Sequence, residues 1–163
     1  MNAVALLDSL CEFTKEKVKD IQMPTKPQKD TPSKERAPEV YKMRLPNSRS
    51  AKDVAPYIIH QIITLNGNRV TVRSIFAVYS DDEQLGGIRL LNLMERLRIA
   101  FLEEAVIGGY FVLDTEPNSK SDAATKETIE YIVYPDDTAP FFAGEMATTW
   151  IIPNIERKVD FYG

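Results

Sequence analysis

Apolar residues recur at steps of three and four residues in two stretches of the chain, which is the spacing of one helix face. The first stretch spans residues 3–21, with repeating positions Val4, Leu7, Leu10, Cys11, Thr14 and Val18. The second runs from Ile88 to Ala105, with the apolar stripe Leu90, Leu91, Met94, Leu97, Phe101, Leu102 and Ala105. We expect two helices, the longer of which covers one face of a sheet.

The ends of the longer helix carry signals of their own. Ser80 and Glu83 have the spacing of a capping box. Glycines 86 and 87 weaken a helix, so we expect a short turn there and a regular helix only from Ile88. Glycines 108 and 109 are predicted to end it.

Strand-like segments surround this helix. Residues 57–65 and 69–79 flank Asn66-Gly67-Asn68, a strong hairpin signal. A two-residue loop gives one register; a three-residue loop that ends in a bulge pairs Ile62 with Val72 and puts His60 opposite Ser74. We prefer the second register, because it aligns the apolar residues of both strands on one buried face. Further strands are predicted at residues 39–45, 110–113, 128–134 and 146–152.

These elements predict an α+β fold, in which a long amphipathic helix packs on one face of an antiparallel sheet. The chain divides into an N-terminal helix (1–22), a Pro-rich linker (23–38), an α+β domain (39–153) and a C-terminal tail (154–163). Dense prolines favour extended, solvated chain in the linker. The tethered helix has two possible docking places, its own domain or a neighbouring subunit. A polar loop is expected over residues 115–126.

Composition narrows the class of protein. The 163 residues are 44% hydrophobic and 27% charged, as in a globular protein with one core of ordinary size. The net charge of −4 argues against a protein that coats nucleic-acid phosphates. A single cysteine excludes an intrachain disulfide. The start of the chain lacks the basic region of a signal peptide, and no apolar run approaches membrane-spanning length, so we expect a cytosolic protein with no membrane partner.

The search for catalytic chemistry yields structural interpretations. We expect Cys11 to be an inert buried residue, and His60 to be a half-buried ring that bonds a neighbour such as Ser74. The clusters Asp81-Asp82-Glu83 and Asp136-Asp137 are best explained by helix capping and a turn. Neither glycine pair matches a phosphate-binding loop. The sequence therefore predicts no enzyme, no metal and no cofactor.

Four residues are candidates for a subunit interface. Arg98 falls inside the apolar stripe. Its stem either lies along the sheet and brings the guanidinium to the sheet edge, or the guanidinium pairs with a carboxylate such as Glu145, within the chain or across a subunit contact. Phe141 and Phe142 are expected in a loop or bulge. Aromatic side chains there either anchor another chain or close the local core.

Several short phrases, in fixed order over residues 37–153, resemble small virion-assembly proteins of tailed bacteriophages, of the tail terminator or neck (head-tail joining) type. They are Ala55-Pro-Tyr-Ile-Ile-His60, Val70-Thr-Val-Arg73, Tyr79-Ser-Asp-Asp-Glu-Gln84, Leu91-Asn-Leu-Met-Glu-Arg96 and Phe142-Ala-Gly-Glu-Met-Ala-Thr-Thr-Trp150, followed by Pro153.

The resemblance implies an α+β fold and a homohexameric ring at the head-proximal end of the tail, located in the virion and assembled in the host cytoplasm. Such a ring ends polymerisation of the tail tube protein and presents a surface to the head-tail connector proteins. DNA passes through its lumen without sequence-specific binding. The family implies no enzyme activity and no cofactor.

Three alternatives stay open at this stage. The first is a head-tail connector or completion protein, one step nearer the head. The second is a monomeric cytosolic binding or regulatory protein that uses the sheet face or the Phe141–Phe142 segment as its partner site. The third is a small enzyme that uses His60 with Asp81 or Asp82.

Overall fold

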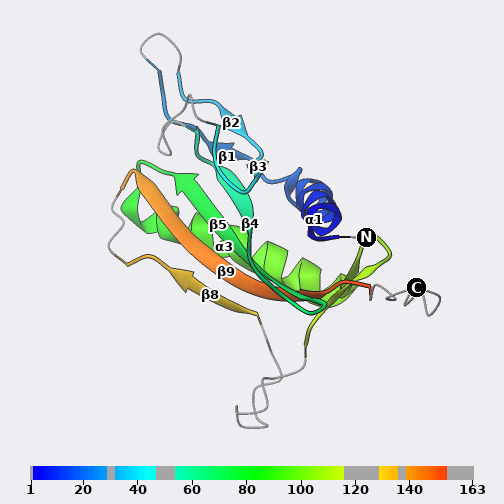
Figure 1. Ribbon diagram of the computed structural model, residues 1–163. Helices are drawn as coiled ribbons and strands as arrows, with labels where there is room; N and C mark the ends of the chain where they lie inside the picture. The colour runs from blue at the N-terminus through cyan, green and yellow to red at the C-terminus, as the bar shows by residue number, and fades with distance from the viewer. Residues whose placement is uncertain (1, 29–31, 47–53, 116–128, 136–138, 154–163) are drawn as a thin grey trace, which may run out of the picture.

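The computed structural model describes residues 2–28, 32–46, 54–115, 129–135 and 139–153. In these described ranges, two helices, α1 (Ala3–Val18) and α3 (Glu83–Glu104), accompany a curled and mostly antiparallel sheet (Figure 1). The short strands are β1 (Met23–Pro24), β2 (Glu35–Arg36), β3 (Glu39–Lys42), β6 (Val106–Ile107), β7 (Phe111–Leu113) and β8 (Glu130–Val133). The long strands are β4 (Tyr57–Asn66), β5 (Arg69–Tyr79) and β9 (Phe141–Ile151). The fold class is α+β, as predicted.

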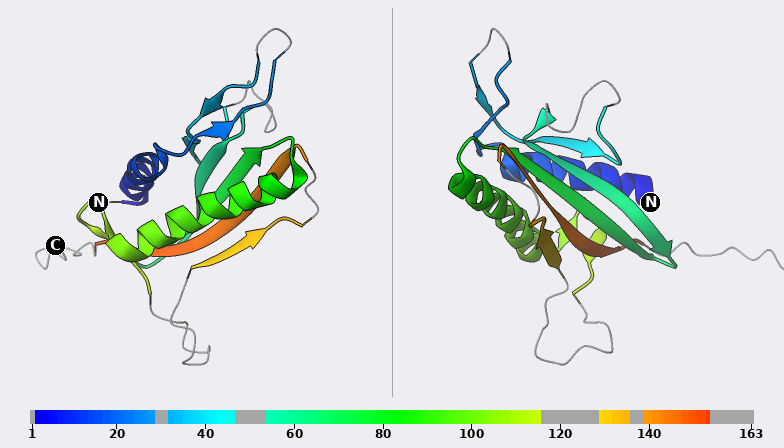
Figure 2. Two further views of the ribbon diagram at one scale, coloured as in Figure 1. Left: turned by 180° about the vertical axis from the view of Figure 1, so that it is seen from behind. Right: turned by 90° about the vertical axis from the view of Figure 1, so that its left-hand side faces the viewer.

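The main sheet has the order β3-β4-β5-β9-β7-β6. Strand β9 pairs with β5 along its whole length, and its other side is shared by β7 and β8. The sequence predicts an antiparallel sheet, but strand β3 is parallel to β4, so the sheet is mixed. Both helices cover the same face of the sheet, which leaves the opposite face open beside β8 (Figure 2).

Alternation along β5 builds two cores, because successive side chains point to opposite faces of the sheet. Its even-numbered residues join the helices in the main core, whose largest members include Trp150, Phe76, Phe101, Leu6 and Leu10. The odd-numbered Ala77 and Tyr79 join a smaller core on the other face. That smaller core lies toward one end of the sheet and does not reach Arg73, which is exposed.

The hairpin between β4 and β5 has the predicted register. Ile62 pairs with Val72 and His60 with Ser74. The predicted loop is wrong, however. Asn66 pairs with Arg69 across a two-residue loop, and the register shift lies inside β4, between Ile62 and Thr64. The shift restores the register that a three-residue loop would have given, so the apolar pattern identified the pairing although the turn was misread.

Helix α3 starts earlier than predicted. Asp82 is its N-cap, and its Oδ1 accepts hydrogen bonds from the backbone N–H groups of Gln84 and Leu85 at 2.8 and 3.0 Å. The paired glycines lie inside the helix, which ends at Glu104, before the second glycine pair. The N-cap is therefore two residues after Ser80, the predicted capping residue. Glycines 108 and 109 instead form part of the turn between β6 and β7.

Helix α1 packs on its own domain. Its buried residues include Leu6, whereas the predicted Val4 is 63% exposed. The helix contacts β3, β4 and α3, and Leu6 and Leu10 lie in the main core. The sequence left two docking places open for this helix, its own domain or a neighbouring subunit, and in the structure it packs on its own domain.

The Pro-rich segment is not simply extended. Its two short strands, β1 and β2, pair with each other, and the Thr25 hydroxyl donates to the Lys34 carbonyl at 2.7 Å. Met23 is buried in the main core. The segment is therefore a paired arm anchored at its base. Pro24 stands opposite Glu35 in this two-stranded sheet, where both strands are edge strands, and proline is compatible with such a position.

Phe141 and Phe142 lie in β9, which begins five residues earlier than predicted. The expected loop or bulge is therefore wrong: Tyr79 pairs with Phe141 and Val78 with Phe142. The Asp136-Asp137 turn, the C-terminal tail and residues 116–126 of the predicted polar loop lie outside the described residues.

Candidate functional site

Strand β8 is an edge strand, which pairs with β9 and with no other described strand. The backbone N–H of Tyr134, just after β8, donates to the Ala143 carbonyl at 3.0 Å. Hydrogen bonding alternates along an antiparallel pair, so Glu130 and Ile132 also bond to β9. The backbone groups of Tyr131 and Val133 consequently point to the outer edge. Such an edge can pair with another chain.

On the helix side of β8, Arg98 forms a bidentate pair with Glu95. Its Nε and Nη2 donate to the two carboxylate oxygens, each at 2.9 Å. This pair, together with a hydrogen bond from Tyr131, lowers the pKa of Glu95, and the bond to Glu95 raises the pKa of Tyr131. Within the chain Arg98 pairs with Glu95 and not with Glu145, because Arg98 and Glu145 lie on opposite sides of the sheet. A pair between them across a subunit contact stays a prediction.

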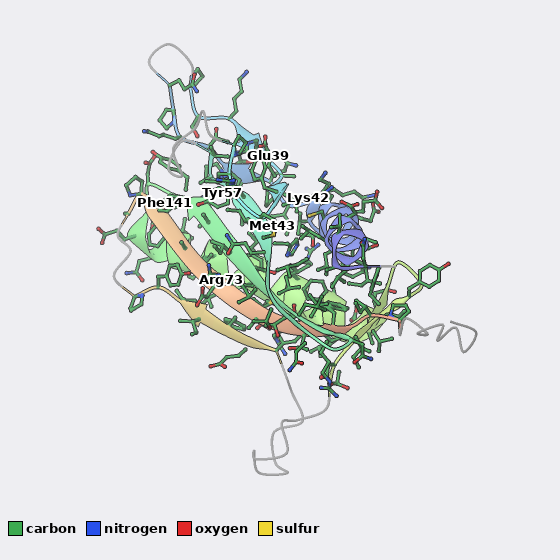
Figure 3. The ribbon with its side chains drawn as sticks, in the orientation of Figure 1. Glu39, Lys42, Met43, Tyr57, Arg73 and Phe141 are labelled. Atoms are coloured by element: carbon green, nitrogen blue, oxygen red, sulfur yellow. The ribbon has the colours of Figure 1, made fainter. Side chains whose placement is uncertain are left out.

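On the open side of β8, Glu145 accepts a hydrogen bond from the Tyr134 hydroxyl at 3.0 Å. Its carboxylate also lies 3.9 Å from Nε of Arg73. Arg73 in turn donates to the Gln61 amide oxygen at 2.9 and 3.0 Å. Figure 3 shows Arg73 on this open face. Arg98 and Glu145 do not meet, but they flank the same edge strand from its two faces.

A shallow depression of about 230 Å³ lies beside Glu145 on the open face. Ligand pockets usually start at about 300 Å³, so this depression is smaller than a typical small-molecule site. Its apolar part includes Ile63 and Ile132, which are 49% and 50% exposed. Its charged rim consists of Arg73, Glu130 and Glu145. A surface of this kind suits a side chain from another protein.

The opposite face of the molecule carries a second apolar surface. On the outer side of α3, Leu85, Ile88, Leu91 and Ile99 are 40–52% exposed. Ile88 and Ile99 are eleven residues apart, about three turns, so they lie on one line of the helix. We call these four residues the α3 ridge. Exposed apolar side chains grouped in this way mark interaction surfaces more often than scattered ones.

Phe141 and Phe142 are both partly buried. The Phe141 side chain packs against the smaller core and the Phe142 side chain against the main core. The Phe142 ring lies directly against Gly86 of α3, where a Cβ atom would be 2.1 Å from Cε2. Both rings thus take part in closing the local core, and their interface role stays a prediction.

His60 is fully buried and not half-buried as expected. Its Nδ1 lies 2.7 Å from the Ser74 hydroxyl, the predicted neighbour, and its Nε2 lies 2.7 Å from the Thr14 hydroxyl. The Thr14 hydroxyl already donates to the Leu10 carbonyl at 2.7 Å, so it accepts a hydrogen bond from Nε2–H. Nδ1 then accepts from Ser74. Burial lowers the pKa of His60 to about 4, and the ring is neutral at pH 7.

The carboxylates proposed to pair with His60 have other partners. Asp81 accepts a hydrogen bond from the Tyr79 hydroxyl at 2.8 Å, and Asp82 caps α3. With both ring nitrogens already bonded to hydroxyl groups, His60 does not form the acid–base pair that the enzyme hypothesis requires. Cys11 is buried, and burial raises the pKa of its thiol, as an unreactive cysteine requires.

Within the described ranges, no group of three histidine, cysteine or acidic side chains could hold a metal ion. Among the helices of those ranges, none combines the length and apolar character needed to cross a bilayer.

Two parts of these surfaces were missed from the sequence. The Arg98–Glu95 pair has helical i, i+3 spacing, so a search for local charge pairs would have found it. The α3 ridge was hidden because Leu91 was assigned to the buried stripe, whereas Leu93 is buried and Leu91 is exposed. The burial of one leucine or the other depends on how the helix is rotated on the sheet.

No protein-family model matches the chain. No curated protein matches it significantly.

Proposed function

We propose that this chain is a structural virion protein of a tailed bacteriophage. Copies of it form a homohexameric ring at the head-proximal end of the tail, end polymerisation of the tail tube and join the tail to the head. The proposal starts from the phrases that resemble tail terminator and neck proteins, and it assigns the chain no catalytic reaction.

One observation carries the proposal: apolar side chains are exposed on both opposite faces of the molecule. The α3 ridge lies on the helix face, and Ile63 and Ile132 lie on the open sheet face. Two different surfaces on opposite sides are what a head-to-tail contact needs, and such contacts close into a ring when the rotation between copies permits. A monomeric binding protein needs only one such surface.

A ring also gives termination a physical basis. One side of the ring would match the last ring of tube subunits, and the other would bind connector proteins instead of further tube subunits. The net charge of −4 is compatible with a lumen through which DNA passes without being held.

Purified protein tests this proposal directly. Light scattering after size exclusion should give a hexamer of the 18.5 kDa chain, and negative-stain images should show rings. Phage lacking the protein should make tails of abnormal length or tails without heads. A chain that stays monomeric at every concentration and is absent from purified virions would contradict the proposal.

A further inference from the structure

The tip of the β4–β5 hairpin carries an asparagine that is followed directly by a glycine. Asn66 is the last residue of β4, and Gly67 and Asn68 form the two-residue loop that leads to Arg69. Gly67 has a φ of 63°, and a Cβ atom placed on it would meet no atom within 4 Å. Asn66 and Gly67 are both exposed, so water reaches the peptide bond between them.

An asparagine can lose its side-chain amide without an enzyme. The backbone nitrogen of the following residue gives its proton to hydroxide and attacks the asparagine Cγ, and the bond from Cγ to the amide nitrogen breaks, so that ammonia leaves with a proton from water. The resulting five-membered succinimide ring then adds water across one of its two C–N bonds, which yields aspartate or isoaspartate. A following glycine favours the attack, because it has no Cβ to shield its nitrogen.

Both reacting groups are available at the hairpin tip. The ladder engages the backbone N–H groups of Asn66 and Arg69, which flank the loop, and not that of Gly67. Among the described residues, none forms a hydrogen bond with the Gly67 N–H or with the Asn66 side-chain amide. The nucleophile and the carbon that it attacks are therefore not held by other groups.

This end of β4 also opens at small cost. Residues 63–66 are all exposed, and the apolar members Ile63 and Leu65 are 49% and 55% exposed. A segment with so few buried contacts opens locally much more readily than the whole domain unfolds. Asn66 can thus leave the extended geometry of the ladder and bring its Cγ to the Gly67 nitrogen while the main core stays folded.

The other asparagines of the described residues lack this combination. The N–H that follows Asn68 belongs to Arg69 and is engaged in the ladder. Asn92 lies inside α3, where the next N–H takes part in helical hydrogen bonding and Leu93 is fully buried. The side-chain oxygen of Asn2 accepts a hydrogen bond at the start of α1, at 3.0 Å.

We propose that Asn66-Gly67 is a site of spontaneous deamidation in the folded protein, with water as the only co-reactant. The proposal does not depend on ring assembly. Either product adds a negative charge to the hairpin tip. Isoaspartate also adds a carbon atom to the main chain, next to a loop whose length sets the pairing of Asn66 with Arg69, so this product disturbs the end of the ladder.

Peptide mapping of the full-length protein by mass spectrometry measures the reaction. During incubation at pH 6, 7.5 and 9, residue 66 should gain the mass difference between an amide and a carboxyl group, and fragment ions locate the change. The rate should rise with pH, because the nucleophile is the deprotonated nitrogen, and should exceed the rates at Asn68 and Asn92 about tenfold. In the Asn66→Gln control, which would need a larger ring, residue 66 should stay unchanged.

The same measurement in concentrated urea tests the role of local opening. The rate at Asn66 in the folded protein should lie within about a hundredfold of the rate in the unfolded chain. A larger slowing would show that the ladder holds Asn66 in place and would overturn the inference. A rate at Asn66 no faster than at Asn68, or a mass change that persists in the same peptide of Asn66→Gln, would overturn it as well.

Discussion

At the scale of single residues, His60 ties α1 to the sheet through a chain of buried hydrogen bonds. The Ser74 hydroxyl donates to Nδ1, Nε2–H donates to Thr14, and Thr14 donates to the Leu10 carbonyl. Every member is buried, so each polar group depends on its protein partner and not on water. The sole histidine thus has a clear structural role.

This arrangement predicts acid sensitivity. The folded-state pKa of His60, about 4, lies below the ordinary value of 6.5, so the unfolded chain binds the proton first as the pH falls. The stabilisation is complete above pH 6.5 and is lost progressively toward pH 4, at about 1.4 kcal/mol per pH unit. Urea unfolding should therefore give a free energy about 2 kcal/mol lower near pH 5 than near pH 7.5.

The His60→Leu variant is the control for this pH dependence. It should be less stable at neutral pH, because Ser74 and Thr14 lose a buried partner, at a cost of about 1–3 kcal/mol. Its stability should change far less between the same two pH values. A wild-type protein equally stable at both would show that His60 is not held neutral by the fold.

The contact between Phe142 and Gly86 predicts opposite effects for two neighbouring glycines. Alanine at position 86 would force the Phe142 ring to move, whereas a Cβ at Gly87 meets open space. We expect Gly86→Ala to cost about 1–3 kcal/mol by overpacking, and Gly87→Ala to gain about 0.5–1 kcal/mol from the helix. Urea unfolding compares them. Equal stability of the two variants would show that the ring moves aside freely.

At the scale of elements, α1 belongs to the main core and is not an appendage. Leu6 and Leu10 are fully buried, and burying each such side chain contributes about 1.5–3 kcal/mol. Removing the helix would also expose the main-core residues beneath it. That loss is comparable to the whole stability of a small domain, about 5–15 kcal/mol.

We therefore expect a chain that lacks residues 1–20 to lose its cooperative unfolding transition. Circular dichroism during a urea titration measures this. The full-length Val4→Ser variant is the matched control for changes in α1, because Val4 is largely exposed, and it should unfold like the wild type. A truncated chain that unfolds cooperatively would show that residues 39–153 form an independent domain.

Local patterns predicted elements well where the signal was strong and poorly where distant contacts decided the outcome. The β4–β5 register followed from the apolar face shared by Ile62 and Val72, which any correct pairing had to bury. The start of β9 was missed, because Pro140 and Gly144 indicate a loop. Pairing of this segment with β5 overrides that local preference.

The candidate site was predictable only in part, for the same reason. Arg98 and Glu145 were identified as unusual residues, but their partners depend on which face of the sheet each one occupies. β8 is a strand of four residues whose position beside β9 creates the edge, and short-range patterns carry no information about that neighbour. The exposure of Ile88 and Ile99 likewise follows from the rotation of α3 on the sheet.

At the scale of the whole molecule, one sheet with helices on one face leaves the other face available for contact. A sheet normally buries at least one face, and here the smaller core covers the second face only toward one end. The remaining open area combines apolar and charged groups around Glu145. This asymmetry allows copies to stack helix face against sheet face. Assembly of that kind would bury the apolar side chains that stay exposed on the open sheet face of the folded chain.

Replacing Ile132 tests this view, because it separates assembly from folding. Ile132 is half exposed in the apolar part of the depression, so Ile132→Lys should change the free energy of unfolding of the isolated chain by no more than about 0.5 kcal/mol. In the ring it would place a charge within an apolar contact, which is costly when unpaired. Light scattering should then show monomers that remain folded by circular dichroism. Val4→Lys, at a position of α1 that is 63% exposed, should assemble normally. A ring that persists in Ile132→Lys would place the contact elsewhere.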